Sequence, residues 1–339
     1  MAPRSTPRLV DDKRSLDESP EAADSSQQSS AAASEGMPDP QRRAPICIPG
    51  EIAGDMTESL VRLQVARKRP LFALVATQID ENIWDYVYSW KTELRAVGQS
   101  EPVDVLIHSP GGVLTPCYLV ARFLAHCMNS WTALVPRLAV SGATLITLGS
   151  RDIIMSHGAQ LGPLDPQVIS KRPQKFFTSE RQSPLEALEL VSYVRELTFS
   201  SMDTSMHELL RQGVAPQRAL ESSIEIATRV ARPLLERIEP YDLAALRLDS
   251  RLARLYCERV ARPIDQSRQT QRNANYEALV EFFPAHEFAI DIVEARDNLK
   301  FNVNEPDGTI ESIFDELRSK LSRAEAYIGL FPKDSPSKD

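Results

Sequence analysis

VDVLIHSPGG, residues 103–112, joins an apolar run to a turn that contains two consecutive glycines. The run Val103–Ile107 is short and almost wholly apolar, which is typical of a strand buried on both faces of a sheet. An apolar pattern with helical spacing follows directly, from Val113 to Met128. Parallel strands need a crossover of this kind, since a tight hairpin joins only antiparallel strands. The stretch therefore predicts one strand–turn–helix unit of a parallel sheet.

The same unit recurs on both sides of this stretch. One short apolar run precedes it after Pro70 and two more follow it, with segments of helical periodicity between them. Such alternation with short connections predicts right-handed crossovers and an α/β fold with a mostly parallel sheet. The predicted strands are 71–76, 103–107, 132–135 and 152–155, and the predicted helices are 81–97, 113–128 and 142–148.

Beyond about residue 180 the pattern becomes wholly helical. Ser183 and Pro184 supply an N-cap followed by proline at the first helical position. A glycine-to-proline segment at 213–216 then breaks the periodicity. Two further helices are predicted at 217–238 and 241–260, and Pro233 is expected to kink or split the first of them.

The chain divides into a core and several additions. Residues 276–303 return to a helix–turn–helix–strand pattern, and an amphipathic helix is predicted at 309–328. The first 44 residues are rich in Ser, Ala, Pro and charge, so they bury too little apolar surface to offset the entropy of ordering. We expect a disordered tail at 1–44, a core at 45–180, a helical insertion or covering and assembly helices at 181–262, a loop at 263–273, the C-terminal part of the core with its terminal helix at 274–331, and a tail at 332–339.

Composition excludes several classes of protein. The 339 residues include 39 Lys and Arg against 47 Asp and Glu, which argues against a nucleic-acid-binding surface. No run of about 20 apolar residues is present, so no integral membrane segment is expected, and the polar N-terminus lacks the apolar part of a secretory signal. The 4 cysteines are too sparse for a disulfide scaffold and lack metal-ligand spacing, so we expect a reducing, cytoplasmic setting and no metal.

Gly111 and Gly112 stand where a predicted strand meets the start of a helix. Glycines leave backbone N–H groups accessible to a ligand, and the helix N-terminus adds positive potential. Two such amides can hold the oxyanion of an acyl-transfer reaction. The alternative is a tight turn that needs glycine for its shape alone. His108, at the strand end, either shapes this pocket or is a strand-end polar residue.

AVSGAT, residues 139–144, repeats this arrangement after the next strand. Ser141 would lie at the carboxyl edge of the sheet, where α/β proteins bind ligands. Gly142 and Ala143 are small enough for a carbonyl substrate to approach closely. The hydroxyl becomes a nucleophile if an imidazole within about 3 Å takes its proton. The alternative is that Ser141 is a helix N-cap, which is worth about 1 kcal/mol.

Two later histidines are candidates for this base. His157 ends an apolar strand, and His286 lies in the segment PAHEF, residues 284–288. The carboxylates of Asp165 and Asp291 are candidates to orient an imidazole. The alternatives are a turn residue between two prolines for Asp165 and a helix N-cap for Asp291.

Together these motifs resemble the Clp-protease and signal-peptide-peptidase clan of serine peptidases. The narrower similarity is to the serine dehydrogenase proteinase family, and it covers residues 70–303. It implies a Clp/crotonase-like core of repeated ββα units, with a helical insertion and a C-terminal α/β segment. The motifs that carry it are SGATLI at 141–146, DIIM at 152–155, LGPLDPQ at 161–167 and PAHEF at 284–288.

The resemblance also implies roles for residues named above. Ser141 matches the nucleophile, and the backbone amides of Gly112 and Gly142 would form the oxyanion hole. His157 falls where Clp proteases place their catalytic histidine. His286 matches the narrower family's own motif and is the preferred base.

Signal peptide peptidases use a Ser–Lys dyad instead, for which Lys171 or Lys175 could serve. A lysine base must be buried, with its pKa lowered toward about 7. Both lysines lie in a polar stretch together with Arg172, which argues against this arrangement.

The expected function is therefore that of a serine-type endopeptidase acting on proteins or peptides through an acyl-enzyme. No cofactor is expected. The sequence contains no P-loop, so we expect this chain to hydrolyse peptides without ATP. Because members of this clan assemble into rings or stacks, a homo-oligomer is expected. The alternatives are an inactive crotonase-fold scaffold or accessory protein, and an acyl-CoA enzyme of crotonase type.

Overall fold

A computed structural model describes residues 43–164, 168–169, 181–182, 184–236, 240–261, 275–283 and 287–333. All of them lie within one compact unit, Pro40–Asp339. The predicted loop at 263–273 lies outside the described residues, as does the predicted N-terminal tail except for its last two residues.

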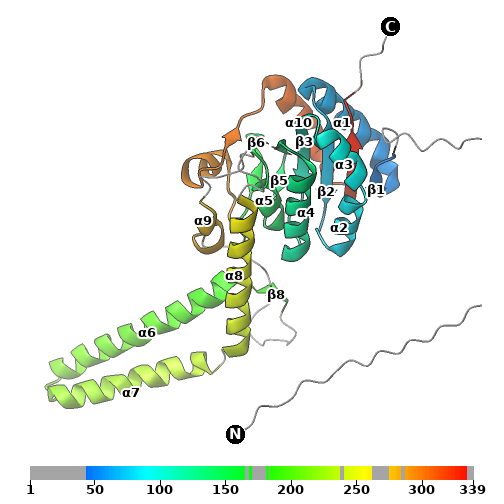
Figure 1. Ribbon diagram of the computed structural model, residues 1–339. Helices are drawn as coiled ribbons and strands as arrows, with labels where there is room; N and C mark the ends of the chain where they lie inside the picture. The colour runs from blue at the N-terminus through cyan, green and yellow to red at the C-terminus, as the bar shows by residue number, and fades with distance from the viewer. Residues whose placement is uncertain are drawn as a thin grey trace, which may run out of the picture. The chain divides into compact units, whose positions relative to one another are not determined.

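A seven-stranded sheet, in the order β1-β11-β2-β3-β4-β6-β10, forms the centre of the described fold (Figure 1). The five strands from β2 to β10 are parallel, and the β1–β11–β2 edge is antiparallel. The predicted α/β fold with a mostly parallel sheet is confirmed. The strands are β1 (Ile46–Ile48), β2 (Leu71–Ala76), β3 (Val103–His108), β4 (Trp131–Val135), β6 (Asp152–Met155), β10 (Val303–Asn304) and β11 (Ala326–Phe331).

Helices cover both faces of this sheet, because successive strand residues point to opposite sides. In β2, Phe72 and Leu74 belong to one apolar core, while Ala73 and Val75 belong to the other. The first core is covered by α2 (Glu81–Tyr88), α3 (Lys91–Gly98), α4 (Leu114–Cys127), α5 (Gly142–Thr147) and α8 (Pro240–Ala261). The second is covered by α1 (Ala53–Arg67) and α10 (Gly308–Leu321).

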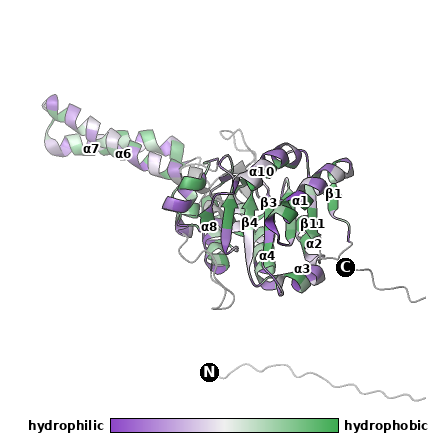
Figure 2. Cartoon of the chain, turned by 90° about the horizontal axis from the view of Figure 1, so that it is seen from above, coloured by the Kyte–Doolittle hydropathy of each residue, from purple (hydrophilic) through white to green (hydrophobic). Residues whose placement is uncertain are grey.

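The helical region forms a hairpin of α6 (Pro184–Arg211) and α7 (Pro216–Leu235), after which α8 packs against α4 and α5 (Figure 1). Four small residues of α7 are buried at four-residue spacing: Ala219, Ser223, Ala227 and Ala231. Figure 2 shows hydrophobic and hydrophilic residues intermixed along the hairpin. Pro233 does not split α7, which continues to Leu235 and ends within one turn of the proline, and the kink at Pro233 stays a prediction.

Three element predictions need correction. The helix predicted at 309–328 ends at Leu321, and β11 follows as a central strand beside β2. The helix predicted at 81–97 is two helices, separated at Ser89–Trp90. Helix α1 was not predicted. The remaining short elements are η2 (Gly50–Ile52), β5 (Leu138–Ala139), β7 (Gln160–Leu161), β8 (Val168–Ile169), β9 (Arg181–Gln182), α9 (Tyr276–Glu281) and a π-helical turn at Glu294–Asn298.

Candidate active site

The loops that follow β3 and β4 are joined by backbone hydrogen bonds at the carboxyl edge of the sheet. The Ser109 N–H donates to Leu138 O at 3.1 Å, and the Val140 N–H donates to Ser109 O at 3.0 Å. This pairing extends β3 alongside β5. It brings the double-glycine turn and the Ser141 turn, which are 29 residues apart in the sequence, into one place.

Ser141 has an unusual backbone conformation, with φ 53° and ψ −121°. The Ala143 N–H donates to Val140 O at 3.0 Å, which closes a four-residue turn around Ser141 and Gly142. These values describe the first central position of a type II′ turn, where glycine is preferred. The half-buried Ser141 side chain makes no capping hydrogen bond to α5, so the alternative role as a side-chain N-cap is not observed.

The Gly112 amide points toward the Ser141 turn. Ile79 pairs with the other side of this segment, because its N–H donates to Gly111 O and its carbonyl accepts from Val113, both at 2.8 Å. Gly112 is the residue between these two hydrogen bonds, and in such pairing its N–H points away from Ile79. Gly112 N lies 3.6 Å from where a Cβ of Gly142 would be. Neither the Gly112 N–H nor the Gly142 N–H donates a hydrogen bond to any residue that the structure describes.

Gly111 is required both for its backbone conformation and for its close contacts. Its φ is +108°, which L side chains rarely adopt. A Cβ there would lie 2.8 Å from Val140 O and 2.9 Å from Ser141 Cβ. A Cβ on Gly112 would lie 2.1 Å from Ile79 O. Gly111 thus lets the first loop approach the serine turn at backbone contact distance, and Gly112 lets it pack against Ile79 on the other side.

Thr144 and Gly162 support the serine turn from the far side. Buried Thr144 Oγ1 lies 2.7 Å from Ala139 O and 2.9 Å from Gly162 O, and it accepts the Gly162 N–H at 3.1 Å. A Cβ on Gly162 would lie 3.4 Å from Ser141 N. Leu161 and Ile290 exchange two backbone hydrogen bonds of 2.9 and 3.0 Å, so the segment before Ile290 is anchored beside this support.

His157 lies beside α10, on the other face of the sheet from α5. Its Nε2 is 3.4 Å from Glu305 Oε2, and its Nδ1 is 3.5 Å from Glu311 Oε1. The neighbouring Ser156 hydroxyl donates to Glu311 at 2.8 Å. The His157 side chain is 62 % exposed, and no hydrogen bond joins it to Ser141 among the described residues.

The other predicted site residues are placed as follows. His286, Asp165, Lys171 and Lys175 lie outside the described residues. Asp291 caps the turn that follows it, since its Oδ1 accepts the Val293 and Glu294 N–H groups at 2.9 and 2.8 Å. This matches the N-cap alternative for Asp291.

His108 is buried at the end of β3. It lies two residues from Leu106, whose side chain is in the core beneath α1 and α10, and strand alternation places His108 on the same face. Burial and, to a lesser extent, the charge of Arg137 lower the pKa of His108 to about 4, so its imidazole is neutral at pH 7. Its Nδ1 has no hydrogen-bond partner in the described part of the chain.

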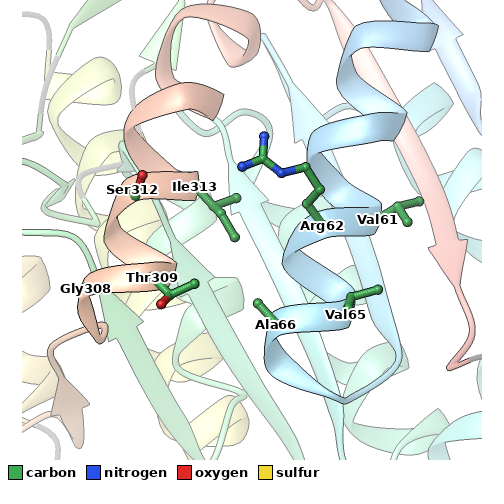
Figure 3. A pocket seen from close by; sticks show the side chains of 8 residues that line it. All are labelled: Val61, Arg62, Val65, Ala66, Gly308, Thr309, Ser312 and Ile313. Carbon is green, nitrogen blue, oxygen red and sulfur yellow. The ribbon is translucent and has the colours of Figure 1, made fainter.

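A groove lies between α1 and α10 (Figure 3). It encloses about 610 Å³ and is lined by Val61, Arg62, Val65, Ala66, Gly308, Thr309, Ser312 and Ile313. These helices cover the opposite face of the sheet from α4 and α5, so the groove is separate from the Ser141 turn. Within the described ranges, no group of three His, Cys, Asp or Glu side chains is arranged to hold a metal ion. None of the helices described has the length and apolarity needed to span a bilayer.

Sequence reasoning missed four residues that build the site. Ile79 pairs with the glycine turn, Gly162 and Thr144 support the serine, and Cys117 lies under Gly142. Gly162 and Thr144 lie inside the motifs LGPLDPQ and SGATLI, and the sequence assigns neither of them a role. Cys117 lies in the predicted helix 113–128 with no sequence signal that marks it. No motif in the sequence around Ile79 predicts that it contacts Gly112.

Comparisons with known proteins find similarity over part of the chain. The model of a family described as ClpP-like SDH-type serine proteinase matches residues 85–230. The uncharacterized protein MJ0137 of Methanocaldococcus jannaschii is 40 % identical over 134 residues, covering 38 % of this chain and 47 % of the relative. The uncharacterized protein MJ1495 of the same organism is 29 % identical over 133 residues, covering 38 % and 45 %. The chain thus spans about half the length of the curated relatives it matches.

Two solved structures are also similar, both of mutants of the 1510-N membrane-bound stomatin-specific protease, one of them with a substrate peptide. Both are 17 % identical to this chain, with TM-scores of 0.29 and 0.28. They cover 44 and 45 % of this chain, and 67 and 72 % of their own chains are matched. The family match at 85–230 includes the double-glycine turn and Ser141, and it confirms, over that part of the chain, the resemblance to the serine dehydrogenase proteinases.

Proposed function

We propose that this protein is a serine-type endopeptidase that cleaves peptide bonds through an acyl-enzyme on Ser141. The observation that carries the proposal is the II′ turn that holds Ser141 at φ 53° beside the Gly112 and Gly142 amides. A side chain in this glycine-preferred conformation costs about 1–3 kcal/mol, and such strain is concentrated at functional sites. The family match over the same residues supports a serine peptidase.

In the proposed mechanism, the Ser141 Oγ attacks the carbonyl carbon of the scissile peptide bond while the base takes its proton. The carbonyl oxygen becomes an oxyanion, which the Gly112 and Gly142 N–H groups stabilise. The base then protonates the leaving amine, and the acyl group stays on Ser141. The base next takes a proton from a water molecule, whose oxygen attacks the ester carbonyl. The bond to Ser141 Oγ breaks, the acid product leaves, and the base returns the proton to Oγ.

His286 is the base in this proposal. It is four residues before Ile290, whose backbone pairs with Leu161 beside the support of the serine turn. This short separation along the chain supports the assignment. On its other side, buried Phe283 belongs to the same core as Cys117. His157 contacts the carboxylates of Glu305 and Glu311 on the α10 face of the sheet, opposite α5, and this location favours His286 over His157.

The proposed substrates are proteins or peptides, and the proposed enzyme is a homo-oligomer that needs no cofactor and no ATP for peptide hydrolysis. Large apolar side chains are exposed on all three helices of the insertion, for example Phe199 at 61 %, Ile224 at 48 % and Leu248 at 62 %. Apolar surface of this extent is typical of an interface between subunits. All four cysteines are free thiols, which favours a cytoplasmic location.

A fluorophosphonate probe tests the proposal, because it reacts with serine nucleophiles that have a base and an oxyanion hole. Peptide mass spectrometry should find the adduct on Ser141, and Ser141→Ala should abolish it, whereas the control Ser319→Ala on the surface of α10 should react like the wild type. His286→Ala should slow labelling about 100-fold or more, and His157→Ala should change it less than about twofold.

A folded protein that is not labelled at Ser141 would overturn the proposal. Binding of a CoA ester by that unlabelled protein would instead indicate the crotonase-type acyl-CoA enzyme. Absence of both activities would indicate the inactive scaffold.

A further inference from the structure

Cys117 lies where α4 and α5 cross beneath the serine turn. Its side chain is fully buried. A Cβ on Gly142 would lie 2.3 Å from Cys117 Sγ, 3.1 Å from Cys117 Cβ and 3.6 Å from Gly112 N. The thiol and the Gly112 amide therefore approach Gly142 from the same side, and Cys117 Sγ is the nearest atom to that position.

The connectivity makes this contact important for both oxyanion-hole donors. Gly112 directly precedes Val113, the N-cap residue of α4. Cys117 is in the first turn of α4, where its N–H donates to Val113 O at 3.2 Å. Gly142 is the first residue of α5. The distance from the Gly112 amide to the Gly142 amide thus depends on how closely the first turn of α4 approaches the start of α5, and the sulfur occupies that contact.

The thiol has no chemical role of its own at this position. Burial raises the pKa of Cys117 to about 12, so the sulfur stays protonated and is a poor nucleophile at neutral pH. What it contributes is volume, in a core where a change of a single methylene is felt by the neighbours.

We propose that Cys117 is a positioning residue for the oxyanion hole, and that its sulfur sets the spacing between the Gly112 and Gly142 amides. This proposal rests on the proposed peptidase function. Valine at this position would press an extra methyl group against Gly142, and alanine would leave a void into which Gly142 could relax. Serine is closest in shape and should hold the spacing best.

The test compares Cys117→Val, Cys117→Ala and Cys117→Ser with two matched controls. Cys127→Ala removes a buried thiol from the other end of α4, and Cys257→Ala removes one from α8. The measured quantities are the rate of fluorophosphonate labelling at Ser141, the kcat and KM for a peptide substrate, and the melting temperature.

Cys117→Val and Cys117→Ala should slow labelling and lower kcat about 10- to 100-fold with KM little changed, because a displacement of about 1 Å in a catalytic group can cost that much. Cys117→Ser should recover most of the rate. The controls should label like the wild type even where they lose as much thermal stability. Wild-type labelling rates in Cys117→Val and Cys117→Ala, or equal losses in the controls, would overturn the proposal.

A crystal structure of Cys117→Val separates this proposal from the proposed function, since it does not depend on activity. The separation between Gly112 N and Gly142 N should change relative to the wild type. An unchanged distance between Gly112 N and Gly142 N would contradict the positioning role of Cys117, even if the wild type proves to be a peptidase. A changed distance, in a protein whose wild type is not labelled at Ser141, would contradict only the peptidase assignment.

Discussion

Ser141 adopts backbone angles that suit glycine, at the start of a helix whose N-terminal amides face a second loop. Glycine would relieve the strain, so the presence of serine indicates that a hydroxyl is needed at this position rather than a stable turn. Loss of function commonly accompanies relief of strain at such sites. Substitutions at Ser141 can therefore separate the effect on stability from the effect on activity.

Ser141→Gly should be more stable than Ser141→Ala by about 1 kcal/mol, because glycine accepts the positive φ while alanine keeps the strained Cβ. Neither variant should react with a fluorophosphonate. The free energy of unfolding in urea measures the difference. Equal stability of the two variants, or a more stable Ser141→Ala, would contradict the strained geometry of the turn.

Gly111→Ala should destabilise the protein by about 2 kcal/mol or more and abolish labelling of Ser141, because φ is +108° and the new Cβ would lie 2.9 Å from Ser141 Cβ. Gly54→Ala is the matched control, since its position in α1 has open space around it and alanine favours helices. Urea unfolding and labelling rates check both variants. A Gly111→Ala protein that folds and labels normally would rule out the close approach of the two loops.

The residues of the site were predictable from the sequence to different extents. Ser141, Gly111, Gly112 and Gly142 could be predicted as candidates because each lies in a segment that follows an apolar strand, and a strand end that leads into a helix has a known place in a parallel sheet. Ile79 could not be found in this way, because its contact with Gly112 depends on the packing of distant segments.

At the scale of elements, α1 and α10 are joined across the back of the sheet by a small polar cluster. Glu316 Oε1 accepts from the Ser59 hydroxyl at 2.8 Å and from Lys320 Nζ at 2.9 Å. The Arg62 guanidinium forms an ion pair with the other carboxylate oxygen, Glu316 Oε2. The hydrogen bonds from Lys320 and Ser59, together with these positive charges, lower the pKa of Glu316 from 4.5 to about 2.

This depressed pKa gives a pH dependence of defined sign. The cluster stabilises the fold fully above the unfolded-state pKa near 4.5, and its contribution is lost as pH falls through the folded-state pKa near 2. Glu316→Gln should be less stable than the wild type at pH 7 by at most about 1 kcal/mol, since the carboxylate is partly exposed. Urea unfolding at pH 7 and pH 2.5 should show the gap shrinking on acidification. A gap that widens at low pH would contradict this account.

The C-terminal segment shows where a local sequence pattern gives the wrong secondary structure. Leu317, Leu321 and Ala324 recur at helical spacing, so the pattern predicted a helix continuing to Ile328. The segment Ala326–Phe331 instead pairs along its whole length with β2, which is about 250 residues earlier in the chain. Long-range pairing of this kind overrides local periodicity. The parallel strands were found because each is a short buried run between turn residues.

At the scale of the whole molecule, the α6–α8 region gives the strongest indication of self-assembly. On α8, Tyr241, Leu248 and Leu255 are spaced seven residues apart and are 84, 62 and 39 % exposed. A seven-residue apolar repeat is the pattern by which helices pair side by side. We expect this stripe to be covered by another subunit.

Leu248→Arg should therefore reduce the mass of the particle measured by sedimentation, because a charge buried in an apolar interface is strongly unfavourable. Glu58→Arg, an exposed change of charge on α1, is the control and should leave the assembly intact. Circular dichroism checks that both variants fold. A wild type that sediments as one chain, or a Leu248→Arg variant of unchanged mass, would contradict assembly through α8.

The central claim is that the Ser141 hydroxyl lies beside a preformed pair of backbone donors. A crystal structure of the fluorophosphonate adduct tests it most directly, since the phosphonyl oxygen mimics the oxyanion of the tetrahedral intermediate. The account predicts phosphorus bonded to Ser141 Oγ and one phosphonyl oxygen within about 2.7–3.1 Å of both Gly112 N and Gly142 N. An adduct whose oxygen contacts neither amide, or a folded protein that forms no adduct at Ser141, would contradict it.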